Sequence, residues 1–68
     1  MRIDLNGDWR ELAPESETDV ASALEQLGYG RSVIATALNG EFIAAAERAR
    51  TRLRDGDRLE VLAPMQGG

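Results

Sequence analysis

Two Asn-Gly dipeptides, at positions 6–7 and 39–40, restrict the folds open to this chain more than any other feature. The sequence reads "RIDLNGDWRELA" around the first and "SVIATALNGEFI" around the second. Asn-Gly favours the type I′ turn, in which both central residues have positive φ, and this turn joins antiparallel strands. Apolar and polar residues alternate beside the first turn, as in a half-buried strand, and the second segment is β-branched and apolar. We therefore predict two β-hairpins, with strands at 2–6, 9–13, 33–38 and 42–43.

Between the hairpins, the segment "DVASALEQLG" has the pattern of one amphipathic helix. Its apolar residues recur at helical spacing on one face, which we assign to the core: Val20, Ala23, Leu24 and Leu27. Ser16 and Thr18 are predicted to cap the start of the helix, and the acidic residues at 15, 17 and 19 suit the positive end of its dipole. Gly28 is predicted to end it.

A fifth strand is predicted after an Asp55-Gly56 turn. In it, Leu59 and Val61 alternate with Arg58, Glu60 and Leu62. The segment 44–54, "AAAERARTRLR", fits either a short helix or an irregular crossing. The order β-β-α-β-β-β predicts an α+β fold, with a mixed five-stranded sheet packed on one main helix and the last strand parallel to the first. Pro64 can end the last strand, so we expect a domain over 1–64 and a flexible tail over 65–68.

Composition excludes several kinds of chemistry. The 68 residues include no Cys and no His, and all eight basic residues are Arg. The chain therefore has no thiolate or imidazole for metal binding or catalysis, and no Lys for a P-loop or a Schiff base. A net charge of −4 disfavours nucleic acid as a partner. No apolar run approaches membrane-spanning length and no signal peptide is present, so we expect a cytoplasmic, non-enzymatic protein without a metal site.

Several of these segments together resemble one family. The turns "LNGDW" and "LNGEF", the closing "LRDGDRLEVLAPMQGG" and the final Gly67-Gly68 are similar to the ThiS family, the sulfur carriers of thiamine biosynthesis, over essentially the whole chain. The resemblance implies a ubiquitin-like β-grasp fold. It also implies that the carboxylate of Gly68, with Gly67 as a spacer, is adenylated by an E1-like enzyme and converted to a thiocarboxylate. Sulfur then passes to thiazole synthase.

The partners implied by this chemistry are the E1-like adenylating enzyme, a sulfur donor protein and thiazole synthase. A free carboxylate is a poor electrophile and must be activated by phosphoryl chemistry. The chain has no Walker-type lysine, so we expect it to bind no cofactor itself, and the activating enzyme to supply ATP and Mg²⁺.

The predicted partner-binding surface surrounds the base of the tail. Leu62 points opposite to the core residues of the last strand, so we expect it to be exposed. Three further apolar side chains are expected to extend the same patch: Phe42, Pro64 and Met65. Gln66 belongs to the tail, and Arg58 lies across the last strand from the core. The alternatives are core packing under a loop for the apolar residues and a solvated position for Arg58.

Other functions stay open at this point. The same tail chemistry could serve a molybdopterin precursor, a cysteine-forming enzyme or tRNA thiolation. A ubiquitin-like protein modifier and a purely structural binding module also fit a β-grasp domain. The Arg-rich segment 48–54 fits a solvated surface or, as the second choice, a docking patch for an acidic partner.

Overall fold

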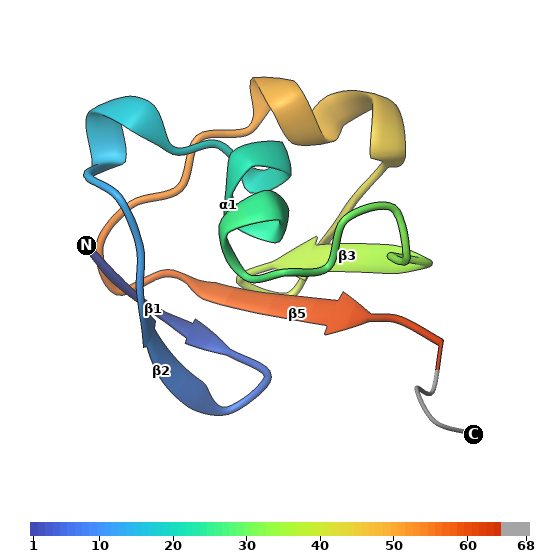
Figure 1. The fold of residues 1–68 in the computed structure, drawn as a ribbon, viewed down its shortest axis with the longest axis horizontal. Coiled ribbons are helices and arrows are strands. Elements are labelled where there is room, and N and C mark those ends of the chain that lie inside the picture. The colour runs from blue at the N-terminus through green and yellow to red at the C-terminus, as the bar shows by residue number, and fades with distance from the viewer. Residues whose placement is uncertain (65–68) are drawn as a thin grey trace.

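The computed structural model describes residues 1–64, in which a five-stranded sheet packs one face against a short α-helix (Figure 1). The strand order is β2-β1-β5-β3-β4, with β5 parallel to β1 and the other neighbours antiparallel. The strands are β1 (Arg2–Leu5), β2 (Asp8–Glu11), β3 (Ala35–Leu38), β4 (Glu41–Ile43) and β5 (Arg58–Leu62). The helices are α1 (Val20–Gln26) and the 3₁₀ helices η1 (Glu15–Glu17) and η2 (Ala45–Arg50). The predicted α+β architecture is confirmed.

Both predicted hairpins are present and both use the expected turn. Asn6 and Gly7 have φ angles of 50° and 95°, and Asn39 and Gly40 have φ angles of 51° and 86°. These angles are the left-handed conformation that a type I′ turn requires at both central residues. β3 begins two residues later than predicted, although the N–H of Ile34 already donates to the carbonyl of Leu62 at 2.7 Å.

The start of α1 differs from the prediction. Asp19 is the N-cap, and its Oδ1 accepts a hydrogen bond from the backbone N–H of Ser22 at 2.7 Å. Ser16 lies in η1, and the hydroxyl of Thr18 is buried and donates to the carbonyls of Ala13 and Pro14. The prediction that Ser16 and Thr18 cap the helix is therefore wrong, because the intervening 3₁₀ turn delays the helix start to Val20.

The end of α1 matches the prediction. Gly28 has a φ of 86° and follows the C-cap residue Leu27. Its N–H donates to the carbonyl of Glu25 at 3.1 Å, and the N–H of Tyr29 donates to the carbonyl of Leu24 at 3.0 Å. This pair of bonds is the Schellman motif, in which a left-handed glycine lets the chain leave the helix with its last carbonyls satisfied.

The core lies between α1 and the inner face of the sheet. Buried apolar side chains come from β1, β5, the helix and two connections: Ile3, Leu5, Leu12, Val20, Ala23, Leu24, Leu53 and Leu59. The helical stripe is confirmed, with Leu27 partly buried at its end. No helix among residues 1–64 has the length and apolar character needed to cross a bilayer.

The segment 44–54 contains both of the structures that its sequence allows. η2 occupies its first half, and the chain then extends past the start of α1. The N–H of Val20 donates to the carbonyl of Thr51 at 2.8 Å, and the N–H of Leu53 donates to the carbonyl of Thr18 at 3.2 Å. Leu53 is 1% exposed, so this crossing contributes a core residue.

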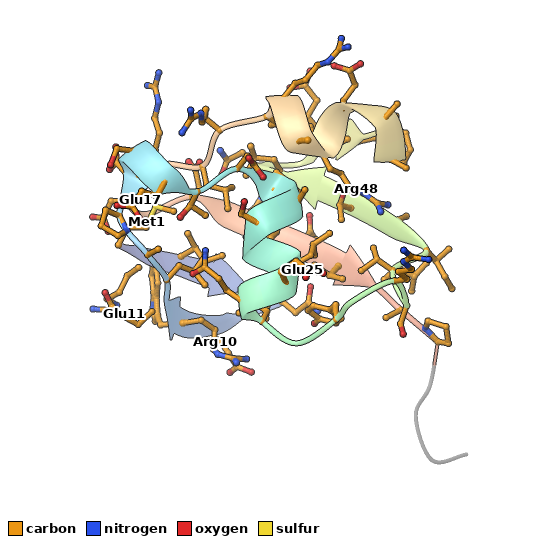
Figure 2. All side chains as sticks on the ribbon, turned by 45° about the horizontal axis from the view of Figure 1, so that its top comes forward. Met1, Arg10, Glu11, Glu17, Glu25 and Arg48 are labelled. Atoms are coloured by element: carbon orange, nitrogen blue, oxygen red, sulfur yellow. The ribbon has the colours of Figure 1, made fainter. Side chains whose placement is uncertain are left out.

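The first residue extends the β1–β2 pairing. The amino group of Met1 donates to the carbonyl of Leu12 at 2.9 Å, and the N–H of Leu12 donates back to the carbonyl of Met1 at 2.8 Å. The same amino group lies 3.4 Å from the Glu11 carboxylate, and Figure 2 shows both residues at one end of the sheet. These contacts hold the end of β1 that lies opposite its turn.

Candidate protein-interaction site

The outer face of the sheet, opposite α1, carries the residues predicted to bind partners. Strand register places Phe42 of β4 beside Ala37 of β3, and Ala37 beside Glu60 of β5. In the next row, Ala35 lies beside Leu62. Directly paired residues project from the same face of a sheet, so these five side chains share the outer surface.

Two of the exposed large apolar side chains on this face lie on β4 and β5. Phe42 is 68% exposed and Leu62 is 59% exposed, as predicted. A shallow hollow of about 340 Å³ lies between them, with Ala35 and Ala37 among its lining residues. Alanines between larger neighbours leave a depression that a protruding partner side chain can fill. We call Phe42, Leu62 and the two alanines the apolar patch.

The other predicted partner-binding residues are placed as follows. Pro64 is exposed just beyond β5. Arg58 is exposed at the start of β5, and its guanidinium extends toward the turn at Gly40 rather than into the hollow. Four predicted site residues lie outside the described residues: Met65, Gln66, Gly67 and Gly68.

The two turn asparagines hold β5, the strand that leads to the C-terminus. The side chain of Asn6 accepts from the N–H of Val61 at 2.8 Å and donates to its carbonyl at 3.1 Å. The side chain of Asn39 accepts from the N–H of Arg58 at 2.9 Å. Each asparagine therefore forms a turn and also binds β5. Asn6 binds near the end of the strand, and Asn39 binds at its beginning.

Sequence reasoning missed several residues of this site. Asn6 lines the hollow and Ile34 is 60% exposed beside Leu62, yet only the turn role of Asn6 was predicted. The two alanines carry a weak signal, since small residues alternate with Thr36 and Leu38 along β3. The hydrogen bonds from the asparagines to β5 have no sequence signal. The bonded residues are 55 positions apart for Asn6 and 19 positions apart for Asn39.

Comparison with known proteins shows the family of this chain. The family model described as the ThiS family matches residues 3–68. A curated relative, the sulfur carrier protein ThiS of Thermus thermophilus, is 41% identical over 64 residues, which is 94% of this chain and 95% of the relative. The chain belongs to the ThiS family. The resemblance inferred from the turns and the closing segment is confirmed.

Solved ThiS structures have the same fold. The crystal structure of a ThiS thiamine biosynthesis protein from Geobacter metallireducens superposes with a TM-score of 0.77 at 28% identity, covering all of both chains. The solution structure of a thiamine biosynthesis protein from the same organism gives a TM-score of 0.78 at 28% identity, covering this whole chain and 88% of the other. The β-grasp assignment is consistent with both structures.

Family membership fixes the broad role of the chain. ThiS proteins are sulfur carriers of thiamine biosynthesis, and a carrier is acted upon by enzymes rather than being one. The working surface of such a molecule consists of its docking face and the group that it carries. The residues that the structure describes offer the apolar patch as a candidate docking surface.

Proposed function

We propose that the carboxylate of Gly68 carries the sulfur as a thiocarboxylate and donates it for thiazole formation. The observation that carries the proposal is the ThiS match, which extends through residue 68 and so includes Gly67 and Gly68. Glycine suits such a tail, because a residue without Cβ passes through narrow channels and leaves the terminal carbonyl open to attack.

The chemistry requires successive steps at one carboxyl group. A free α-carboxyl is an anion at neutral pH, since its ordinary pKa is about 3.5. Its oxygen attacks the α-phosphate of ATP, which releases pyrophosphate and gives an acyl adenylate. The terminal sulfur of a persulfide on a donor protein then displaces AMP and forms an acyl disulfide. A thiol reductant cleaves the S–S bond of this intermediate, which releases the thiocarboxylate and leaves the donor cysteine in a disulfide with the reductant. In this proposal the E1-like enzyme supplies ATP and Mg²⁺ and the chain binds no cofactor of its own.

The apolar patch is the proposed docking surface for these enzymes. Phe42 and Leu62 offer apolar area that the fold does not bury, and exposed apolar groups of this kind supply binding energy at interfaces. Pro64, Met65 and Gln66 are proposed to continue the contact toward the tail, and Arg58 to border it.

Adenylation can be tested by exchange of labelled pyrophosphate into ATP. We expect the activating enzyme to catalyse exchange only when the chain is present, and deletion of Gly68 to abolish it. Equal exchange with the chain lacking Gly68 would contradict the proposal.

The acceptor is tested separately, by giving the thiocarboxylated chain to thiazole synthase with its small-molecule substrates. We expect thiazole product and loss of the thiocarboxylate. Transfer to a molybdopterin precursor, a cysteine-forming enzyme or tRNA instead would keep the carrier chemistry and reassign the pathway. A Gly-Gly remnant on a target lysine would identify a protein modifier.

A further inference from the structure

A second surface with a distinct charge lies away from the apolar patch. Four of the eight arginines fall within residues 48–54 of a chain whose net charge is −4. Figure 1 shows η1 and the crossing that follows η2 at the end of the molecule opposite the C-terminal end of β5. A partner could therefore contact this region while the patch and the tail are engaged elsewhere.

The backbone determines which of these arginines face solvent. Residues 51–54 are extended, so side chains alternate between the two sides of the chain. Leu53 is buried in the core, which directs Arg52 and Arg54 outward together. Arg48 is different: it is half-buried, and Figure 2 shows it running from η2 back toward the body of the domain.

Arg52 and Arg54 line an open hollow of about 590 Å³ with Glu15, Ser16 and Leu53, which we call the arginine hollow. The guanidinium of Arg52 donates to the carbonyl of Ser16 at 2.9 Å, so its position is fixed by η1. The N–H of Arg54 donates to Asp57 at 2.8 Å, which fixes the backbone there. The Arg52 guanidinium and the Arg54 backbone are therefore both held by hydrogen bonds within the domain.

Neither guanidinium forms an ion pair with a carboxylate of residues 1–64. The one ion pair among residues 1–64 joins Met1 to Glu11, so no arginine of the described chain has a carboxylate partner at ion-pair distance. The acid that lines the hollow, Glu15, accepts instead from the backbone N–H of Asp55 at 2.9 Å. The arginines keep free donors with the geometry that binds carboxylates in pairs.

We propose that the arginine hollow binds a carboxylate-rich segment of an enzyme that acts on this carrier. Charge complementarity selects the occupant: two guanidinium groups line one hollow, that of Arg52 held by Ser16, and they match Asp and Glu side chains of a partner. A nucleic acid fits less well, because Glu15 lies in the hollow and the chain as a whole is acidic. The inference rests on the proposed function only for the identity of the enzymes that serve as probes.

The test compares charge-reversed variants in the two partner reactions. In the double variant Arg52→Glu/Arg54→Glu, we expect the KM for the carrier to rise about tenfold at low ionic strength with the activating enzyme, with thiazole synthase, or with both. The increase should shrink as salt is added, since exposed charges are screened, and kcat should be unchanged.

Two further variants control for folding and for net charge. Arg52→Gln/Arg54→Gln keeps donors near Ser16 but removes both charges, and it should give an intermediate KM. Arg10→Glu/Arg31→Glu changes net charge equally at exposed positions outside the hollow, and Figure 2 shows Arg10 projecting from β2 at the other side of the molecule. This control should keep the original KM.

Equal KM values for all variants with both enzymes would overturn the proposal. So would arginine-dependent binding of a fluorescent single-stranded oligonucleotide, which would assign the hollow to nucleic acid. Either result leaves thiocarboxylate formation intact in every variant, so it is distinguishable from a failure of the proposed function.

Discussion

At the scale of single residues, Asn6 combines a left-handed turn conformation with two hydrogen bonds to Val61. Glycine at this position would keep the turn but lose both bonds. Aspartate would keep an acceptor for the N–H of Val61 and place a second oxygen against its carbonyl. These two substitutions separate the turn role of the residue from its hold on β5.

Asn6→Gly is expected to lower the free energy of unfolding by about 1–2 kcal/mol, because two solvent-accessible hydrogen bonds are lost. Asn6→Asp is expected to lower it further, because its carboxylate cannot donate to the Val61 carbonyl. Denaturant unfolding measures both changes. An Asn6→Asp variant as stable as the original chain would show that the side-chain bonds to β5 contribute nothing.

Phe42 and Leu62 are predicted to matter for binding and not for stability. Because both are more than half exposed, Phe42→Ala and Leu62→Ala should change the free energy of unfolding by less than about 1 kcal/mol. Each should raise the KM of the activating enzyme about tenfold or more, as loss of an interface anchor does.

Trp9→Ala is the matched control for the apolar patch. Trp9 is 56% exposed on the same outer face but at the β2 edge, where Arg2 lies 4.7 Å from its ring centre. Trp9→Ala should leave the KM of the activating enzyme for the chain unchanged. If Trp9→Ala weakened binding as much as Phe42→Ala, the docking surface would have to extend across the whole sheet.

At the scale of elements, the start of α1 depends on one side chain. Asp19→Ala should destabilise the domain by about 1 kcal/mol, because the N–H of Ser22 loses its acceptor. Asp19→Asn should retain most of the stability. Ser16→Ala should have little effect, since the hydroxyl of Ser16 does not cap α1; a larger loss for Ser16→Ala than for Asp19→Ala in thermal unfolding would contradict the assigned cap.

The crossing after η2 is held by Leu53. Leu53→Ala should cost about 2–5 kcal/mol in denaturant unfolding, because it leaves a cavity in a small core. The same substitution at exposed Leu62 provides the comparison, and Leu53→Met, which keeps the volume, should retain most of the stability. Similar losses for Leu53→Ala and Leu62→Ala would mean that the crossing is not packed as described.

The elements also show why sequence predicts some features and not others. Asn-Gly turns and the helical stripe are local patterns, and both hairpins and α1 follow from them. The choice of cap among Ser16, Thr18 and Asp19 depends on a 3₁₀ turn whose stability comes from distant contacts. Leu53 stands between two arginines, so its local pattern suggests a charged surface; its burial depends on long-range packing against the domain.

The candidate site likewise has features that follow from local sequence patterns and features that depend on tertiary contacts. Exposure of Leu62 follows from strand alternation, exposure of Phe42 was expected as part of the same patch, and the structure confirms both. The hollow between them depends on which strands are neighbours, since β3 and β5 are distant in sequence and adjacent in the sheet. The hold of Asn6 on β5 and the joining of Ser16 to Arg52 are likewise tertiary contacts with no local pattern.

At the scale of the whole molecule, the fold presents two different surfaces. The apolar patch lies on the outer face of the sheet beside the end of β5, and the arginine hollow lies between η1 and the crossing. In the proposed function the carrier meets an activating enzyme, a sulfur donor and an acceptor enzyme in turn, and such a carrier benefits from contact surfaces that do not overlap. The sulfur itself is proposed to be bound as a thiocarboxylate at Gly68.

The intact mass of the chain tests this central claim most directly. The chain is incubated with the activating enzyme, ATP, Mg²⁺ and the sulfur donor, and its mass is compared with controls that lack ATP or lack Gly68. We predict an increase equal to one oxygen-to-sulfur exchange, found in the complete mixture and in neither control. An unchanged mass, with an activating enzyme shown to be active on another carrier, would contradict the assignment of Gly68 as the sulfur-bearing residue.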